Sequence, residues 1–351
     1  MSSRLPKKAF RSTGDLAAHL GISRWAVSRV LNGQPGVSES TRQRVEALIA
    51  ESGFEPNRMA RGLRGGATGL VGVLFQEIES PALARKAAQL QQRLRGEGYR
   101  AVIELSAGDQ NWEAETLRHF MSLRVEGIVM VGTTLKATHP LIKQLVKQQV
   151  PAVVIDPASP LPMPTVQLDR SRAMAEAVHY LHGLGHRKFA LLGLESDPIL
   201  GPHRMRGIER ARPELNLSAA DFRSFHLPDR SLQDFLYGAD LGRLWVEQAR
   251  ECTGIIANND RIAIGALRAL REAGLHAPTD FSIIGFDNTD VSSWVEPALT
   301  TIDQQIETLM STAIQLLRAR MSPEPVSPPP VETVEARMIL RDTTGPVPTV
   351  R

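Results

Sequence analysis

Side chains with hydrogen-bonding and stacking chemistry recur at helical spacing near the start of the chain. Arg24, Trp25, Ser28, Arg29 and Asn32 share the outward side of one stretch. Guanidinium forks, a hydroxyl and a carboxamide suit the base edges and phosphates of a DNA major groove. The stretch therefore predicts a helix that contacts nucleic acid.

Short helices must hold these side chains in place. Leu16 and Leu20 lie on one apolar face, Gly21 can end a first helix, and Ser23 can cap the second. A third helix is expected from Ser38, as its cap, through residue 52. Three short helices would give a core just large enough to fix the second one.

The charge of the chain is concentrated near its start. The 351 residues carry a net charge of +3, from 41 basic and 38 acidic side chains. Residues 1–66 hold 11 of the basic and 5 of the acidic ones, which leaves 30 and 33 for the remainder. A polyanionic partner is thus indicated for the N-terminal segment alone.

The segment after the third helix combines arginines with one apolar side chain. Asn57 can cap a helix over residues 58–64, but two turns are too few to persist alone in water. Leu63, between Arg61 and Arg64, has the chemistry of a wedge that unstacks bases in a minor groove. A plain linker, with Leu63 packed on the next domain, is the alternative that these residues leave open.

From Gly69 onward, apolar runs alternate with amphipathic stretches, which indicates parallel sheets covered by helices on both faces. The strands are too many for one sheet, so two similar α/β subdomains are expected. Expected strands are 70–75, 100–105, 127–131, 152–155, 189–194, 254–257, 281–286 and 331–336, and expected helices are 83–96, 113–123, 141–148, 171–184, 232–249 and 261–273.

Several classes of site and location are disfavoured. No window is long and apolar enough for a membrane span, and no signal-peptide core is present, so a cytoplasmic location is expected. Cys252 is the single cysteine, and glycines separate His179, His182 and His186, so we expect no metal. No nucleophile elbow, dinucleotide fingerprint or P-loop occurs, so neither an enzyme nor a cofactor is expected.

Nearly the whole chain resembles the lactose and galactose repressor (LacI/GalR) family of bacterial transcription regulators. The resemblance implies an all-α helix-turn-helix head plus an α/β two-lobed, periplasmic-binding-protein-like ligand domain. It is carried by the segments 26–33 (AVSRVLNG), 37–45 (VSESTRQRV), 56–63 (PNRMARGL), 185–187 (GHR), 259–260 (ND), 284–287 (IGFD) and 297–301 (PALTT).

The family pattern also implies a division of the chain. The expected parts are a DNA-binding head at 1–55, a hinge helix or linker at 56–66, a ligand-binding and dimerisation domain at 67–345, and a tail at 346–351. The first lobe is expected at 67–165 plus 292–325, and the second at 166–291 plus 326–345.

The resemblance assigns roles to residues of the head. Arg24, Trp25 and Arg29 would face bases, whereas Ser28 and Asn32 would anchor the DNA backbone and Ser12 would cap the first helix. Trp25 is unusual at a base-reading position, so the DNA sequence bound should differ from that of relatives. The hinge helix would fold only on DNA and insert Leu63, and its matching residues are Asn57, Arg58, Ala60, Arg61 and Leu63.

Arg204, Asn259 and Asp287 match ligand-contact positions of the family, and Asp156 is a further match. Arginine forks and carboxylates can each hold two adjacent hydroxyls, so a sugar-like effector is implied. Each also has a structural alternative: Arg204 as a surface helix residue, Asn259 as a helix cap, and Asp287 as a turn residue.

One aromatic position of the family is missing. Where relatives begin a helix with a proline and two aromatic residues, this chain has Pro81, Ala82 and Leu83. Trp294 is the candidate to replace the lost ring.

The sequence thus predicts a homodimer that binds a pseudo-palindromic double-stranded DNA operator and responds to a small effector, as a repressor rather than an activator. No heptad repeat follows the last expected strand, so a tetramer is not expected. The alternatives are a small-molecule-binding protein or sugar-modifying enzyme with a vestigial head, and an architectural DNA protein.

Overall fold

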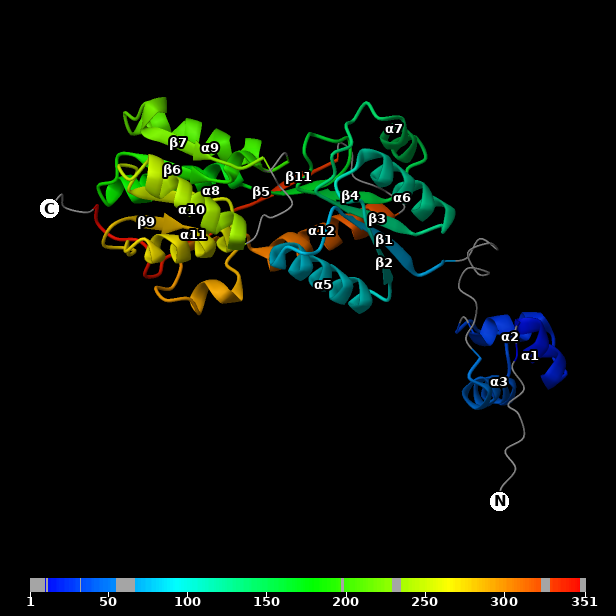
Figure 1. The fold of residues 1–351 in the computed structure, drawn as a ribbon. Helices are drawn as coiled ribbons and strands as arrows, with labels where there is room; N and C mark the ends of the chain where they lie inside the picture. Colours follow the sequence, from blue (N-terminus) through cyan, green and yellow to red (C-terminus); the bar gives the residue numbers. More distant parts are fainter. Residues whose placement is uncertain are drawn as a thin grey trace, which may run out of the picture. The chain divides into compact units, whose positions relative to one another are not determined.

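The computed structural model describes residues 10, 12–31, 33–54, 67–196, 199–228, 235–322 and 329–347. The chain divides into two compact units, Met1–Gly69 and Leu70–Arg351. Figure 1 shows both units, and each is described by itself.

The first unit contains the three expected helices, α1 (Thr13–Leu20), α2 (Arg24–Leu31) and α3 (Glu39–Ser52). Ser12 caps α1 in a reciprocal capping box with Asp15. Ser38 caps α3 by accepting from the backbone of its first turn. These caps confirm the predicted starts, because side-chain oxygens satisfy amide groups that a helix leaves unpaired.

The turn between α1 and α2 also follows the prediction. Gly21 has a φ of 65°, a left-handed conformation that glycine adopts without steric cost. The Ser23 hydroxyl accepts from Ala26 N–H at 3.2 Å, at the start of α2. Leu16 and Val27 are fully buried on the facing sides of the two helices, and Val45 of α3 closes this core.

The first lobe of the second unit has a parallel sheet in the order β11-β5-β4-β3-β1-β2. Helices α5 and α12 cover one face of it, and α6 and α7 lie on the other (Figure 1). The bounds are β1 (Leu70–Phe75), α5 (Pro81–Gly96), β2 (Arg100–Leu105), α6 (Gln110–Ser122), β3 (Gly127–Val131), α7 (Pro140–Lys147), β4 (Ala152–Ile155), β5 (Thr165–Leu168), α12 (Ile306–Met321) and β11 (Val331–Val334).

Alternation along the strands explains these two layers. In β1, Val71, Val73 and Phe75 pack with the apolar side of α5 and α12, whereas Leu74 packs with α6 and α7. Successive side chains of a strand point to opposite faces, so a strand buried on both sides reads as a continuous apolar run.

The second lobe repeats this arrangement around a parallel sheet in the order β7-β6-β8-β9. Residues of α8 and α9 share one core with this sheet and with the first lobe, while α10 and α11 form a second core. The bounds are α8 (Arg170–Gly183), β6 (Phe189–Leu192), η1 (Leu194–Ser196), α9 (Gly201–Glu214), η2 (Ala219–Asp221), β7 (Phe222–Phe225), α10 (Phe235–Gln248), β8 (Gly254–Ala257), α11 (Asp260–Glu272), β9 (Ser282–Ile284), η3 (Asp290–Ser293), β10 (Thr301–Asp303) and β12 (Arg337–Ile339).

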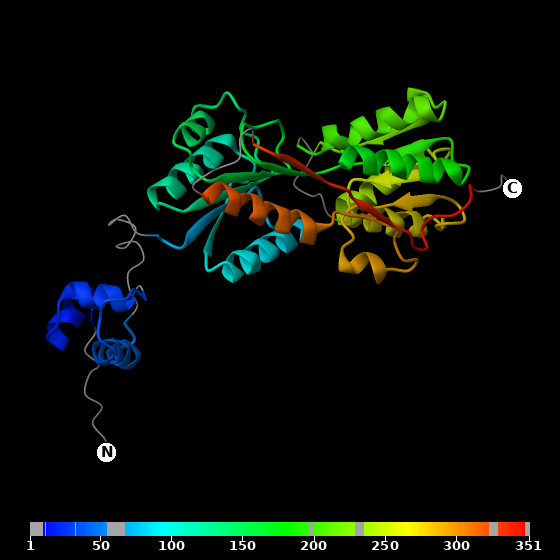
Figure 2. The ribbon, with the colours of Figure 1, turned by 180° about the vertical axis from the view of Figure 1, so that it is seen from behind.

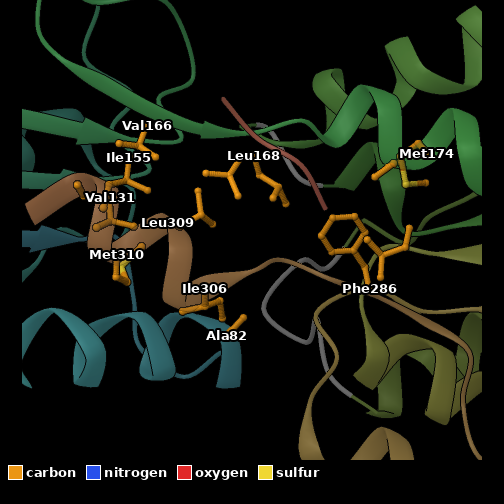
Figure 3. Close-up of a cluster of buried hydrophobic side chains, with 14 of the residues drawn as sticks. Ala82, Val131, Ile155, Val166, Leu168, Met174, Phe286, Ile306, Leu309 and Met310 are labelled. Carbon is orange, nitrogen blue, oxygen red and sulfur yellow. The ribbon is translucent and has the colours of Figure 1, made fainter. Parts of the chain in front are cut away.

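The chain passes between the lobes three times: from β5 to α8, from β10 to α12, and from β11 to β12. In Figure 2 the red C-terminal segment runs from one lobe to the other, and β12 pairs antiparallel with β10. Figure 3 shows the apolar side chains at this junction, with Val131, Ile155 and Leu309 on one side and Met174 and Phe286 on the other. One continuous core therefore joins the lobes.

The observed lobes differ from the expected division in three places. Strand β5 extends the first sheet through Leu168, and β11 pairs with β5 there, although residues 166–168 and 331–334 were expected in the second lobe. The rest of the expected segment 326–345 reaches the second lobe at β12 and at Thr343 and Gly345. Residues 292–303 lie with the second lobe, because Thr300 bridges to Ile284 and β10 pairs with β12. Pairing between distant strands, which no local pattern encodes, decides these assignments.

Candidate functional site

A cavity of about 330 Å³ lies where strands of both lobes end. Gln76 follows β1, Gly132 follows β3, Asp156 follows β4, Asn258 follows β8, and Asp287 comes shortly after β9. The carboxyl ends of parallel strands are where open α/β sheets bind ligands. The cavity therefore brings together side chains from both sheets.

Asp287 lines this cavity, and only one of its two carboxylate oxygens accepts a hydrogen bond from a described residue. Its Oδ1 accepts from Gln304 Nε2 at 2.5 Å, and in the described part of the chain Oδ2 has no hydrogen-bond partner. Its φ of 115° lies in a region that non-glycine residues rarely occupy, and such strain is concentrated at binding sites. Burial raises the pKa of the Asp287 carboxyl above its ordinary value.

Asp260 is a second carboxyl beside Asp287. It is fully buried and accepts from Thr301 Oγ1 at 2.5 Å and from the backbone and hydroxyl of Thr289 at 2.7 and 2.9 Å. Burial and the charge of Asp287 raise the pKa of Asp260 to about 7. Its three accepted bonds hold the loop after β9, so Asp260 supports the wall of the cavity.

Arg204 and Asn259 line the cavity at the starts of two helices. Arg204, in the first turn of α9, is 3% exposed, and its guanidinium lies 4.7 Å from the ring centre of Phe286. This contradicts the alternative that Arg204 is a surface residue. Asn259 caps α11, because its Oδ1 accepts from Ile262 N–H at 2.9 Å. The cap leaves its Nδ2 available as a donor, so capping and ligand contact are compatible.

Asp156 lines the cavity as well, but its carboxylate is committed to protein partners. Arg170 Nη1 and Nη2 donate to its two oxygens at 2.6 and 2.9 Å, Leu168 N–H donates at 2.9 Å, and Lys86 Nζ lies 3.3 Å away. Burial opposes ionisation, yet Arg170 and Lys86 outweigh it and hold the pKa of Asp156 well below its usual range. The carboxylate therefore stays charged as the centre of a buried ion cluster.

Lys86, Arg170 and Gln304 belong to this site although sequence reasoning did not single them out. A signal for Lys86 was present, since it follows Leu83 by three residues and precedes Leu90 by four, on the apolar face of α5. A lysine on the buried side of a helix needs a partner in the interior. Arg170 and Gln304 carry no such signal, because their role depends on where the chain passes between lobes.

The structure does not bring Trp294 to the cavity. Its side chain is 85% exposed at the end of η3, and it is not among the lining residues. Ala82 and Leu83 do line the cavity, so the two positions at which the family resemblance implied aromatic rings are occupied here by small and aliphatic side chains. The suggestion that Trp294 replaces them is therefore corrected.

On the head, Arg24 and Trp25 are exposed on α2, with Trp25 at 57%, whereas Ser28 and Arg29 are half-buried. The Arg29 guanidinium lies 4.7 Å from the Trp25 ring centre, and its Nε donates to Pro35 O at 2.7 Å. Stacking and this bond pre-order two of the predicted DNA contacts. The remaining predicted contacts, Asn32, Asn57, Arg58, Ala60, Arg61 and Leu63, lie outside the described residues.

The three histidines considered for a metal make separate contacts. His179 Nε2 lies 2.8 Å from Glu214, His186 is buried against Thr253 and Ser282, and His182 accepts from Arg187 through its backbone. Within the described ranges, no group of His, Cys, Asp and Glu side chains is arranged to hold a metal. No helix in those ranges has the length and apolar character that crossing a membrane requires.

Two family models match the chain. Residues 14–57 match "Bacterial regulatory proteins, lacI family", and residues 178–344 match "Periplasmic binding protein-like domain". These ranges cover the three-helix head and much of the two-lobed unit.

Whole-chain comparisons agree with both matches. Catabolite control protein A of Priestia megaterium is 31% identical over 316 residues, which are 89% of this chain and 93% of that protein. The lac repressor bound to ONPG in the repressed state has a TM-score of 0.83 at 26% identity, covering 96% of this chain and 100% of that one. A LacI family regulator from Enterococcus faecium with bound ribose has a TM-score of 0.68 at 26% identity, covering 79% and 99%.

Four observations point to the same family. They are the fold, the polar cavity at the strand ends, the exposed helix of the head and the similarity over nearly the full length of the chain. The chain therefore belongs to the LacI family of bacterial regulatory proteins.

Proposed function

We propose that this chain is a transcription regulator that represses from a DNA operator and responds to a small polyhydroxylated effector in the cavity. One observation carries the proposal: a helix with exposed DNA-type donors and a two-lobed polar cavity occur in the same chain. Relatives with bound ONPG and ribose support a sugar-like effector.

In this proposal the head reads the operator through α2. Arg24 and Arg29 donate to base edges or phosphates, and Trp25 supplies apolar contact to bases. The caps at Ser12 and Ser23 place helix N-termini where phosphates can approach, as helix dipoles favour. The hinge segment, through Leu63, widens the minor groove at the centre of the operator.

The effector is held by groups from the second lobe. Asp287 Oδ2 accepts hydroxyls, and Asn259 Nδ2 and the Arg204 guanidinium donate to them. Asp156 contributes differently from the sequence expectation, because its oxygens already accept from Arg170 and Leu168. Its role is to keep Lys86 and Arg170 in place beside the ligand.

Ligand binding is coupled to DNA binding through the spacing of the two lobes. Because the cavity is lined from both lobes, an effector that prefers one lobe arrangement shifts the population toward it. A difference in affinity of about 1.4 kcal/mol between the two arrangements changes operator occupancy about tenfold where occupancy is limiting.

The chain acts as a homodimer, and an apolar groove on the second lobe fits a second copy. The groove, of about 320 Å³, is lined by Ile264 and Leu267 of α11 and by Val295. Trp294, next to Val295, is the most exposed of the large apolar side chains described. Aromatic anchors of this kind commonly form the centre of interfaces.

The effector is bound without being converted. The relatives named above support this, since they are regulators. Proton NMR of a stabilising sugar after prolonged incubation with the protein should show it unchanged, and a product peak would support the enzyme alternative.

DNA binding tests the regulatory function directly. A labelled fragment from upstream of the gene should form a complex that survives excess unrelated DNA. Arg24→Ala should weaken this complex about tenfold, because one base or phosphate contact is worth ~1–3 kcal/mol. Lys143→Ala, on the exposed side of α7, is the control and should bind as the parent does. Binding that is indifferent to sequence and lost with salt would contradict the proposal.

A further inference from the structure

Lys86 places a buried positive charge at the wall of the cavity. It lies on α5, its side chain is 2% exposed, and it is among the lining residues. Its ammonium has three donor hydrogens, and Asp156 is its one hydrogen-bond partner among the described residues, at 3.3 Å. Lys86 therefore has donors left for a molecule in the cavity.

The charge of Lys86 is only partly compensated by Asp156. The Asp156 carboxylate makes its shorter contacts with Arg170, at 2.6 and 2.9 Å, and Arg170 is also 2% exposed. Arg204 is a third buried cation of the cavity, and Asp287 is a second buried carboxyl close enough to interact with Lys86 and Arg170. Three buried cations thus face two buried carboxyl groups. A cation out of contact with water is costly unless a negative group or several acceptors satisfy it.

Two helix N-termini add positive potential to the same cavity. Helix α5 starts after Ser80 and α9 starts after Leu200, and neither helix has a side-chain cap. Ser80 and Leu200 both line the cavity. The backbone amides and dipole at such a terminus favour an anion.

The other acidic side chains that line the cavity do not form ion pairs with Lys86. Glu79 is exposed, and Glu77 accepts from Ser80 N–H at 2.9 Å. Asp287 accepts from Gln304 and presents its other oxygen to ligand hydroxyls. The side of the cavity formed by Lys86 and the start of α5 is therefore the place for a negative group.

We propose that the effector is a polyol with an anionic substituent, a phosphate ester or a carboxylate, whose oxygens accept from Lys86 Nζ. This inference rests on the proposed function, because it adds one group to the sugar-like effector of the same cavity. Lys86 is the residue that selects the acid derivative over its neutral parent. A hydroxyl in the same place would leave the excess of buried positive charge without a counter-charge.

Matched sugars test the inference on the full-length protein. The probes are D-glucose, D-galactose, D-fructose and D-ribose, their phosphate esters, and their aldonic or uronic acids. Thermal shift identifies the stabilising stereochemistry, and calorimetry then gives Kd for the neutral, phosphate and carboxylate forms. We expect an acid form to bind at least about tenfold tighter than its parent, and the better of the two identifies the substituent.

Variants assign the preference to one side chain. Lys86→Met keeps the length of the side chain, and it should weaken binding of the acid form at least about tenfold more than it weakens binding of the neutral parent. Lys86→Arg should retain part of the preference. Lys143→Met is the matched control, because it removes an exposed lysine of α7. Circular dichroism and melting temperature establish that each variant is folded.

The outcomes separate the two proposals. If neutral sugars bind as tightly as their acid derivatives, the proposal of an anionic effector is wrong, but the proposal of a sugar-responsive regulator is still supported. An equal loss for both forms in Lys86→Met would give Lys86 a positioning role only and would also overturn the inference. Stabilisation by no member of the panel would contradict both proposals.

Discussion

Asp156 and Asp287 each follow a strand at the cavity, but they differ in how many protein groups donate hydrogen bonds to their carboxylates. Asp156 is surrounded by donors from Arg170, Leu168 and Lys86, whereas Asp287 has one oxygen without a protein partner in the described ranges. Removing the first should therefore affect stability, and removing the second should affect ligand binding.

Asp287→Asn should weaken effector binding by about 10- to 100-fold, because a bond to a charged group is worth ~1.5–3 kcal/mol. DNA binding without effector should be unchanged. Calorimetry with a stabilising sugar measures the first effect, and fluorescence anisotropy on the operator measures the second. Asp290→Asn, an exposed aspartate of η3, is the control. An unchanged ligand titration would reject the role of Asp287.

Asp156→Asn should lower the free energy of unfolding by about 3–5 kcal/mol, because it removes the carboxylate that pairs directly with buried Lys86 and Arg170. Urea denaturation of the two variants compares this cluster with an exposed pair. Asp240→Asn breaks the ion pair with Arg243, whose side chains are 54% and 57% exposed, and should cost less than about 1 kcal/mol. Similar losses in both variants would show that the cluster is not a stabilising unit.

Among the elements, the helices of the head were defined by local signals. The caps at Ser12, Ser23 and Ser38 and the left-handed Gly21 are each determined by residues within one turn. The hinge was predicted on different grounds, because a helix of two turns is too short to persist alone in water. Its residues lie outside the described ranges, so its role stays a prediction from the sequence.

Leu63→Ala tests that prediction. A side chain that unstacks a base step contributes only when the DNA is bent at the operator, so specific binding should fall much more than binding to unrelated DNA. Gel shifts at matched salt on operator and scrambled duplexes measure both. Leu340→Ala, an exposed leucine of the other unit, serves as the control. Equal losses on the two duplexes would remove the wedge from the mechanism.

At the scale of the whole molecule, the C-terminal segment packs against residues of the second lobe that lie far away in the sequence. The C-terminal segment packs on β9, where Gly345 N–H donates to Ser282 Oγ at 3.0 Å and Thr343 Oγ1 donates to Ile283 O at 2.8 Å. His186 joins the same network, with Nε2 2.9 Å from Ser282 Oγ and 3.2 Å from Gly345 O. Because a carbonyl only accepts, Nε2 carries a proton in this arrangement.

This arrangement makes stability depend on pH. Burial is the main cause that lowers the pKa of His186 below its ordinary value of about 6.5, and Arg187 adds to the effect. The native state therefore binds fewer protons than the unfolded chain in this range. The contribution of His186 is fully present above about pH 6.5 and decreases as the pH falls through that value toward the lower native pKa.

His186→Gln should flatten the decline in melting temperature between pH 7 and pH 5, relative to the parent protein. His226→Gln, which removes an exposed histidine, should leave the slope unchanged. Differential scanning calorimetry across this range measures both slopes. A parent slope retained in His186→Gln would assign the pH dependence to other groups.

The dimer is also a property of the whole molecule. Trp294→Glu places a charge beside the apolar groove of α11 and should shift the protein toward monomer, because burying an unpaired charge opposes association. Sedimentation velocity over a range of concentrations measures the shift. Val146→Glu, at an exposed apolar position of α7, is the control. A dimer as tight as the parent's would move the interface elsewhere.

The sequence by itself determined the head, most long elements and the kind of site. The strand ranges 70–75, 100–105, 127–131 and 152–155 were predicted as observed. Three of them are apolar runs, and 100–105 has apolar residues between Arg100 and Glu104. Helix α12 was also encoded by apolar residues at helical spacing, from Ile306 to Leu317, although it was not predicted. Arg204, Asn259 and Asp287 came from the family pattern, and all three line one cavity.

The tertiary structure decided the rest. Strands β5, β7, β10 and β12 are only three or four residues long, so their pairing depends on partners far away in the chain. Long-range pairing also places β11 in the first sheet, and the packing of the two lobes brings Arg170 into hydrogen-bonding contact with Asp156. The sequence shows Lys86 as a charged residue on an apolar helix face. Only the tertiary structure shows that Asp156 is its ion-pair partner and that Arg170 binds the same carboxylate. Local periodicity determines which face of an element is buried, whereas the fold determines what that face meets.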